Sequence, residues 1–202
     1  MPPLQLGIFI FPEVEVLDFA GPYEVFSLAE NEVGEKLFQV HTIGETTEMI
    51  KARNGLQIAT DYTFNDHPEL DVLIIPGGHG ARVLEVKKQK TLDWIQSQSQ
   101  KVDILASVCT GAFLLAKLGL LDQKNATTHW AHYSELEDQY PSIEVQRNVK
   151  FVDEGKIITA GGISAGINMS FYLVSRLFDK RAAQQTAKRM EYDIQLTMNS
   201  EQ

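Results

Sequence analysis

The sequence predicts an α/β protein built as a three-layer sandwich, in which a mostly parallel sheet carries helices on both faces. Three short and largely apolar runs, at 6–11, 71–75 and 104–108, are typical of strands that are buried on both faces. Segments of helix-forming composition lie between these runs. Strands that alternate with helices favour parallel pairing, so we expect the functional site at the carboxyl ends of the strands.

The first half of the chain contains the first strands and a small hairpin. After the strand at 6–11 we expect a loop over 12–17 and then a helix over 21–30, because its second residue is a proline, which suits the first helical turn. Residues 37–43 predict the next strand. An Asn-Gly pair within 49–59 readily supplies positive φ and predicts a small antiparallel hairpin.

The second half begins with the strand at 71–75 and continues, through helices at 81–86 and 91–98, to the strand at 104–108 and a helix at 112–117. The remaining expected elements are a short strand at 126–128, a helix at 130–139, strands at 145–152 and 156–160 joined by a hairpin turn, helices at 164–178 and 180–192, and a frayed tail at 198–202.

Composition limits the class of protein. The chain has 202 residues, with 18 Lys and Arg against 27 Asp and Glu, and its formal net charge is −9. This balance argues against a nucleic-acid partner, because affinity for a phosphate backbone depends on clustered basic residues. We find no repeat, linker or low-complexity tract, so residues 1–202 are expected to form a single domain.

The sequence also shows no recognisable targeting signal. The amino terminus has no signal-peptide organisation, and no apolar run approaches the length of about 18 residues that indicates a membrane span. The single cysteine excludes an intrachain disulfide and fits a reducing compartment. We therefore expect a cytoplasmic protein without a membrane partner.

That single cysteine, Cys109, lies between a strand and a helix in the stretch Ser107-Val108-Cys109-Thr110-Gly111. Small residues two positions before and after it permit the sharp turn of a nucleophile elbow. Backbone N–H groups and the helix dipole at such a turn are expected to favour the thiolate and to bind a developing oxyanion. The alternative is an inert buried cysteine, since free cysteines usually behave as small hydrophobic residues.

Other candidates should meet Cys109 at the same edge of the sheet. Asp18, in an apolar setting, would have a raised pKa and could exchange a proton with the thiol; capping a nearby helix is its alternative role. Gly77 and Gly78 could bring backbone N–H groups to an oxyanion, or form no more than a turn. The hydroxyl of Thr110 could position substrate or water, or Thr110 could be only a first-turn helix residue.

Histidine is the usual base for a cysteine nucleophile, and the chain has five. His41 and His67 have no partner signal, and His79 could reach the site from a loop or lie on the surface. His129 and His132 have a spacing that can face one way on a helix. A zinc site needs at least a third ligand, which no motif supplies, so we expect no metal.

Taken together, these motifs resemble the ThiJ/PfpI superfamily, whose flavodoxin-like fold is related to that of class I glutamine amidotransferases. The threonine directly after the cysteine, where protease-like members have histidine, argues against a Cys-His peptidase. It resembles the branch of the isonitrile hydratases instead. The stretches that carry the resemblance are 7–12, 17–26, 75–78, 107–116, 126–130 and 159–167.

The resemblance implies an enzyme without cofactors that hydrates a small-molecule isonitrile to an N-substituted formamide, and a homodimer. Cys109 and Asp18 would be the essential pair: the thiolate attacks the terminal carbon, Asp18 supplies a proton and later deprotonates water. Thr110 would orient substrate or water, and backbone N–H groups near Gly78 and Thr110 would stabilise the developing charge.

Two other functions would use the same residues. One is a glyoxalase or deglycase acting on reactive carbonyls, and the other is a non-enzymatic redox or small-molecule sensor that depends on oxidation of Cys109. The superfamily domain also occurs as the sensor of AraC-type regulators. The chain is expected to have no room for a helix-turn-helix module after its single domain.

Overall fold

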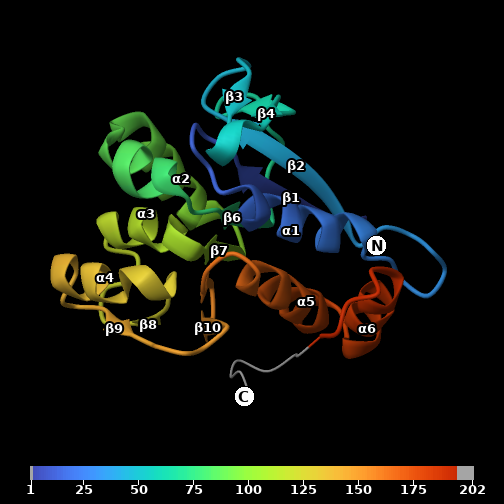
Figure 1. Cartoon of the computed structure of the whole chain (residues 1–202). Coiled ribbons are helices and arrows are strands. Elements are labelled where there is room, and N and C mark those ends of the chain that lie inside the picture. The colour runs from blue at the N-terminus through green and yellow to red at the C-terminus, as the bar shows by residue number, and fades with distance from the viewer. Residues whose placement is uncertain (1, 195–202) are drawn as a thin grey trace.

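A seven-stranded sheet lies at the centre of the computed structural model, which describes residues 2–194 (Figure 1). Its strand order is β10-β11-β7-β6-β1-β2-β5, and every neighbouring pair is parallel except β10 with β11. The mostly parallel sheet is thus confirmed. The strands are β1 Leu4–Phe9, β2 Phe38–Gly44, β5 Tyr62–Thr63, β6 Val72–Ile75, β7 Ile104–Val108, β10 Phe151–Glu154 and β11 Ile157–Ala160.

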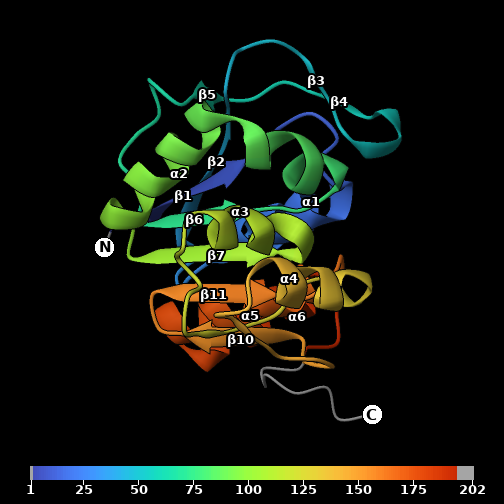
Figure 2. The same ribbon diagram turned by 90° about the vertical axis from the view of Figure 1, so that its left-hand side faces the viewer.

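Helices cover both faces of this sheet, which confirms the three layers (Figure 1, Figure 2). One face carries α1 Val16–Leu28, α5 Ala165–Leu177 and α6 Lys180–Arg189, which pack on one another. The other face carries α2 Gln89–Lys101, α3 Ala112–Lys117 and α4 Tyr133–Gln139.

Shorter elements connect these layers. They are the hairpin of β3 Ile50–Lys51 and β4 Gln57–Ile58, the pair of β8 Asn125–Ala126 and β9 Glu144–Val145, and the single helical turns η1 Arg53–Gly55, η2 Gly80–Leu84, η3 Glu85–Lys87, η4 Cys109–Gly111 and η5 Trp130–His132.

The start of the first helix was predicted wrongly. Helix α1 begins at Val16, so that Pro22 lies inside the helix and Asp18 belongs to its first turn. Pro22 lacks an N–H group, and the helix therefore loses one internal hydrogen bond there, a cost that burial of Phe19, Val25 and Phe26 offsets. The carboxyl end of α6 also differs, because this helix ends at Arg189. The predicted tail at 198–202 lies outside the described residues.

Packing in the core fixes the positions of the ends of the central strands. The strands β1, β6 and β7 are almost completely buried, and Phe9 packs against Phe11, Phe64 and Trp94 with ring centroids 4.8 to 5.5 Å apart. Each fully buried side chain of this size contributes about 1.5–3 kcal/mol to the free energy of unfolding. The loops that follow these strands therefore start from fixed points.

Among residues 2–194, no helix has the length and apolar composition that crossing a membrane requires.

Candidate active site

Cys109 follows the last residue of β7 and has a φ of 56°, in the left-handed region that non-glycine residues rarely adopt. Its backbone is held on both sides: the Cys109 N–H donates to the Gly161 carbonyl at 3.1 Å, and the Thr128 hydroxyl donates to the Cys109 carbonyl at 2.8 Å. A Cβ at Gly111 would collide with the Ile75 carbonyl oxygen. The predicted strand, sharp turn and helix are therefore present, with a small residue where the turn requires one.

Asp18 projects from α1 to the same place and is fully buried. Its Oδ2 accepts a hydrogen bond from the Gly77 N–H at 3.0 Å, while Oδ1 has no hydrogen-bond partner within residues 2–194. Burial raises the pKa of Asp18 to about 8, against a lowering effect of the Gly77 N–H. The carboxyl group is therefore protonated at neutral pH. Because the N-cap of α1 is Glu15 and Asp18 bonds to Gly77, the helix-capping alternative for Asp18 is wrong.

The Cys109 thiol interacts with this carboxyl group, and the residue as a whole is only 6% exposed. Burial raises the pKa of Cys109, and a negative charge on Asp18 would raise it further, whereas the backbone N–H groups of Thr110 and Ile163 lower it. The expectation that the turn favours the thiolate thus fails, because burial outweighs the N–H groups. At neutral pH both members of the pair hold a proton.

Gly77, Gly78 and Thr110 lie beside the pair, but their polar groups bond to one another and to Asp18. The Gly77 N–H is donated to Asp18, and the Gly78 N–H is donated to the Thr110 hydroxyl at 2.9 Å. That hydroxyl in turn donates to the Gly78 carbonyl at 3.1 Å. In this structure, therefore, the two glycine N–H groups and the Thr110 hydroxyl hold the loop after β6, and the N–H groups directed at the thiol are those of Thr110 and Ile163.

Ile163 is a site residue that the sequence did not reveal. It follows β11 and has a φ of 51°, an unusual conformation for a β-branched residue, and its N–H acts to lower the pKa of both Asp18 and Cys109. The available signal was its position directly after Gly161-Gly162 at the end of a strand. Segments after three adjacent strands, β6, β7 and β11, thus meet around the thiol.

A cavity of about 190 Å³ opens beside Cys109. This volume equals about six waters at roughly 30 Å³ each, so the site suits a small molecule. Asp18 is not part of the cavity wall. The lining residues are Glu15, Arg53, Gly78, His79, Arg82, Cys109, Thr110, His129, His132 and Ile163.

Three of the five histidines line this cavity: His79, His129 and His132. The other two lie elsewhere, where His41 bonds to Gln5 and His67 accepts from the Trp94 indole N–H. Within residues 2–194, no cluster of three His, Cys, Asp or Glu side chains is arranged to hold a metal ion.

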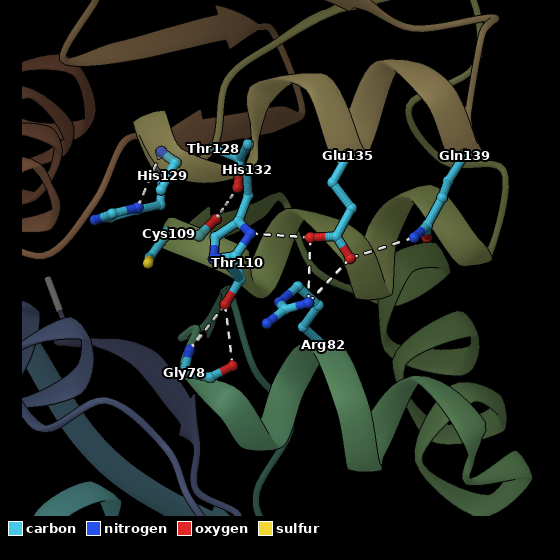
Figure 3. A network of polar contacts seen from close by, with 10 residues as sticks. Gly78, Arg82, Cys109, Thr110, Thr128, His129, His132, Glu135 and Gln139 are labelled. Atoms are coloured by element: carbon cyan, nitrogen blue, oxygen red, sulfur yellow. Dashed lines mark hydrogen bonds and ion pairs between the residues drawn. The ribbon is translucent and has the colours of Figure 1, made fainter.

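His132 belongs to a polar network on the rim of the cavity (Figure 3). Its Nδ1 lies 2.9 Å from Glu135, and Glu135 accepts two hydrogen bonds from Arg82 at 3.0 and 3.1 Å. Neither Arg82 nor Glu135 was predicted from the sequence, although a histidine and a glutamate three residues apart on a predicted helix were a usable signal.

Comparison with known proteins shows the family to which the chain is similar. The model of the DJ-1/PfpI family matches residues 5–176. Isonitrile hydratase from Pseudomonas putida is 38% identical over 189 residues, which cover 94% of this chain and 78% of that protein. The HTH-type transcriptional regulator GbdR from Pseudomonas aeruginosa is 26% identical over 86% of this chain, which spans only 47% of the regulator.

Solved structures show the same fold. A THiJ/PfpI family protein from Pseudomonas syringae aligns with a TM-score of 0.85 and 25% identity, covering 100% of this chain and 80% of that one. DJ-1beta from Drosophila melanogaster aligns with a TM-score of 0.82 and 21% identity, covering 95% of this chain and 100% of that one.

Proposed function

The chain belongs to the DJ-1/PfpI family, and on that premise we propose that it is an enzyme that hydrates isonitriles to N-substituted formamides. One observation carries the proposal: a buried carboxyl group with a pKa near 8 is paired with a cysteine at the wall of a small cavity. Such a pair can move a proton while a carbon–sulfur bond forms. The similarity to an isonitrile hydratase supports the choice of substrate.

The first step adds the thiol to the terminal carbon of R–N≡C. The Cys109 sulfur forms a bond to that carbon and the thiol proton passes to the same carbon, while the Asp18 carboxyl behind the thiol exchanges protons with the sulfur and ends with its own proton restored. The product is a thioimidate, R–N=CH–S–Cys109. The Thr110 and Ile163 N–H groups stabilise negative charge on sulfur as its proton leaves.

The second step consumes water. Water adds to the thioimidate carbon, the carbon–sulfur bond breaks, and the sulfur recovers a proton. The products are the formamide R–NH–CHO and the free thiol, so no oxidant, reductant or cofactor enters the balance.

A second candidate is a small-molecule sensor, which the similarity to GbdR favours because this chain matches about half of a transcriptional regulator. A sensor would bind its ligand in the same cavity without turnover.

The test is turnover of an aryl isonitrile by the purified protein, measured as formamide formed, with Cys109→Ala alongside. We expect turnover in the wild type and none in the variant. An inactive wild type whose Cys109 still reacts with iodoacetamide would refute the hydratase proposal and leave carbonyl substrates or ligand sensing.

A further inference from the structure

Hydrolysis of the thioimidate requires a base that a water in the cavity can reach. Asp18 does not meet this requirement in the structure, because it is fully buried and absent from the cavity wall. One of its oxygens is already bound by the Gly77 N–H. Asp18 is therefore well placed to exchange a proton with the thiol behind the cavity, but not to activate a water within it.

Two histidines that line the cavity, His129 and His132, have a hydrogen bond at one ring nitrogen. In His129, Nδ1 accepts the Ala131 N–H at 3.3 Å, so the proton of the neutral ring lies on Nε2. Burial, followed by the neighbouring His132, lowers the pKa of His129, which keeps the ring neutral. His129 therefore presents a donor, and not a base, to the cavity.

His132 has the opposite arrangement. Its Nδ1 lies 2.9 Å from a Glu135 oxygen, an acceptor that requires the proton on Nδ1. The other nitrogen, Nε2, has no hydrogen-bond partner within residues 2–194, and in the neutral ring it carries the lone pair. Figure 3 shows this nitrogen on the side of the ring away from Glu135, toward Cys109 and Thr110. In its neutral form, His132 thus presents an acceptor to the cavity that contains the thiol.

The network behind His132 fixes the orientation of its ring. Burial acts to raise the pKa of Glu135, but hydrogen bonds from Arg82 and His132 outweigh it, and the pKa is lowered. Glu135 is therefore a carboxylate, which Gln139 also contacts at 3.3 Å. The His132 ring packs edge-on against buried Phe113, with centroids 6.3 Å apart. Orientation and tautomer are both fixed from outside the cavity.

We propose that His132, oriented by Glu135 and Arg82, is the base that activates water for hydrolysis of the thioimidate on Cys109. The inference rests on the proposed hydratase function and divides the proton transfers: Asp18 acts in the addition of the thiol, and His132 acts in the addition of water. Nε2 takes a proton from water as its oxygen bonds to the thioimidate carbon. The electron pair of the C=N bond moves to nitrogen, which takes the proton from His132. When the carbon–sulfur bond breaks, the hydroxyl proton passes to the sulfur.

The experiment mixes the protein rapidly with an aryl isonitrile and follows two quantities, the mass of the intact protein and the release of formamide. His132→Gln should form the adduct, which adds the mass of one isonitrile, at a rate within about twofold of the wild type. Its kcat should fall about 100-fold, in the range expected for loss of a general base, so that the adduct accumulates. Asp18→Asn should form no adduct.

Glu135→Gln tests the orienting network and also serves if His132→Gln does not fold. It keeps an oxygen for His132 but loses the charge, and we expect kcat to fall about 10-fold with accumulation of the same adduct. Glu137→Gln is the matched control, because Glu137 lies on the same helix and pairs with Arg147 outside the cavity. It should behave as the wild type.

The outcomes separate the two proposals. Wild-type turnover with no adduct accumulation in either His132→Gln or Glu135→Gln would overturn the role of His132 and leave the hydratase function intact. A wild type that forms neither adduct nor formamide would overturn the hydratase function and the role of His132 with it. A fall in adduct formation equal to the fall in kcat would also overturn the role of His132, since that result indicates general damage to the site.

Discussion

Replacement of Asp18 by asparagine should change the pH dependence of stability in a way that few single substitutions can. The native state holds the Asp18 proton up to a pKa of about 8, whereas an unfolded chain releases it near 3.8. Between these values the native state binds one proton more than the unfolded state. The free energy of unfolding must therefore fall as pH rises through this interval.

The size of the effect follows from the two pKa values. Each pH unit within the interval costs about 1.4 kcal/mol, so the wild type should lose roughly 3 to 4 kcal/mol between pH 5 and pH 8 through this residue. For a chain of this length that corresponds to a fall in Tm of about 10 °C. The asparagine side chain does not ionise, and the Asp18→Asn variant should lack this part of the slope.

Urea unfolding of the wild type and Asp18→Asn, at several pH values from 5 to 8 under reducing conditions, measures the difference directly. Histidines and surface carboxylates titrate in both proteins and cancel in the comparison. The absolute stability of the variant is not decisive, because the new amide leaves a buried donor near Oδ1 that costs about 1–3 kcal/mol at every pH. Parallel curves for the two proteins would show that Asp18 is ionised in the native state and would refute the proton-transfer role.

The variant should also fold but lose turnover, since an amide cannot exchange the proton.

Thr110→Val should lower the Tm by several degrees, because it removes both hydrogen bonds to Gly78 and leaves the Gly78 N–H unpaired at a cost of about 1–3 kcal/mol; an unchanged thermal melt would contradict this. Gly162→Ala should raise KM more than it lowers kcat, because the new methyl group would collide with the His129 ring. Gly161→Ala is its control, since the nearest atom to a Cβ there is 3.5 Å away, and equal KM values for the two variants would count against the reasoning. Incubation with EDTA should leave turnover unchanged, as residues 2–194 contain no metal-binding cluster, and a loss that zinc restores would contradict this.

The central strands and the turn at Cys109 could be predicted because their signals are local. A buried parallel strand has a continuous apolar run, and a nucleophile turn needs small residues at fixed distances from the cysteine. Asp18 was identified as a candidate by its apolar setting, and its burial confirms that setting. Its place within α1 was missed, because the Gly21-Pro22 pair is a strong local signal for the start of a helix. The earlier start is stabilised by contacts of α1 with α5 and with the sheet, which the local sequence does not show.

The residues of the cavity wall were harder to predict, because they are distant in the sequence and come together only in the folded structure. Arg82 and Glu135 lie 53 positions apart, and the only local signal for the pair is the three-residue spacing of Glu135 from His132. The direction of the Thr110 hydroxyl could not be predicted from the sequence either, because it depends on the left-handed turn at Cys109, after which the hydroxyl bonds to Gly78. Sequence patterns locate such residues near the site but do not orient them.

The hydrogen bond between Asp18 and Gly77 spans 59 positions of the chain, and the one between Thr110 and Gly78 spans 32. Contacts between distant segments form late in folding, because the chain entropy lost in closing long loops is recovered only when the sheet is nearly complete. The pairing of carboxyl and thiol therefore reports on the whole sheet and not on any local element. During refolding, far-UV circular dichroism should recover first, and the capacity to form the isonitrile adduct should return only with the last, slowest phase.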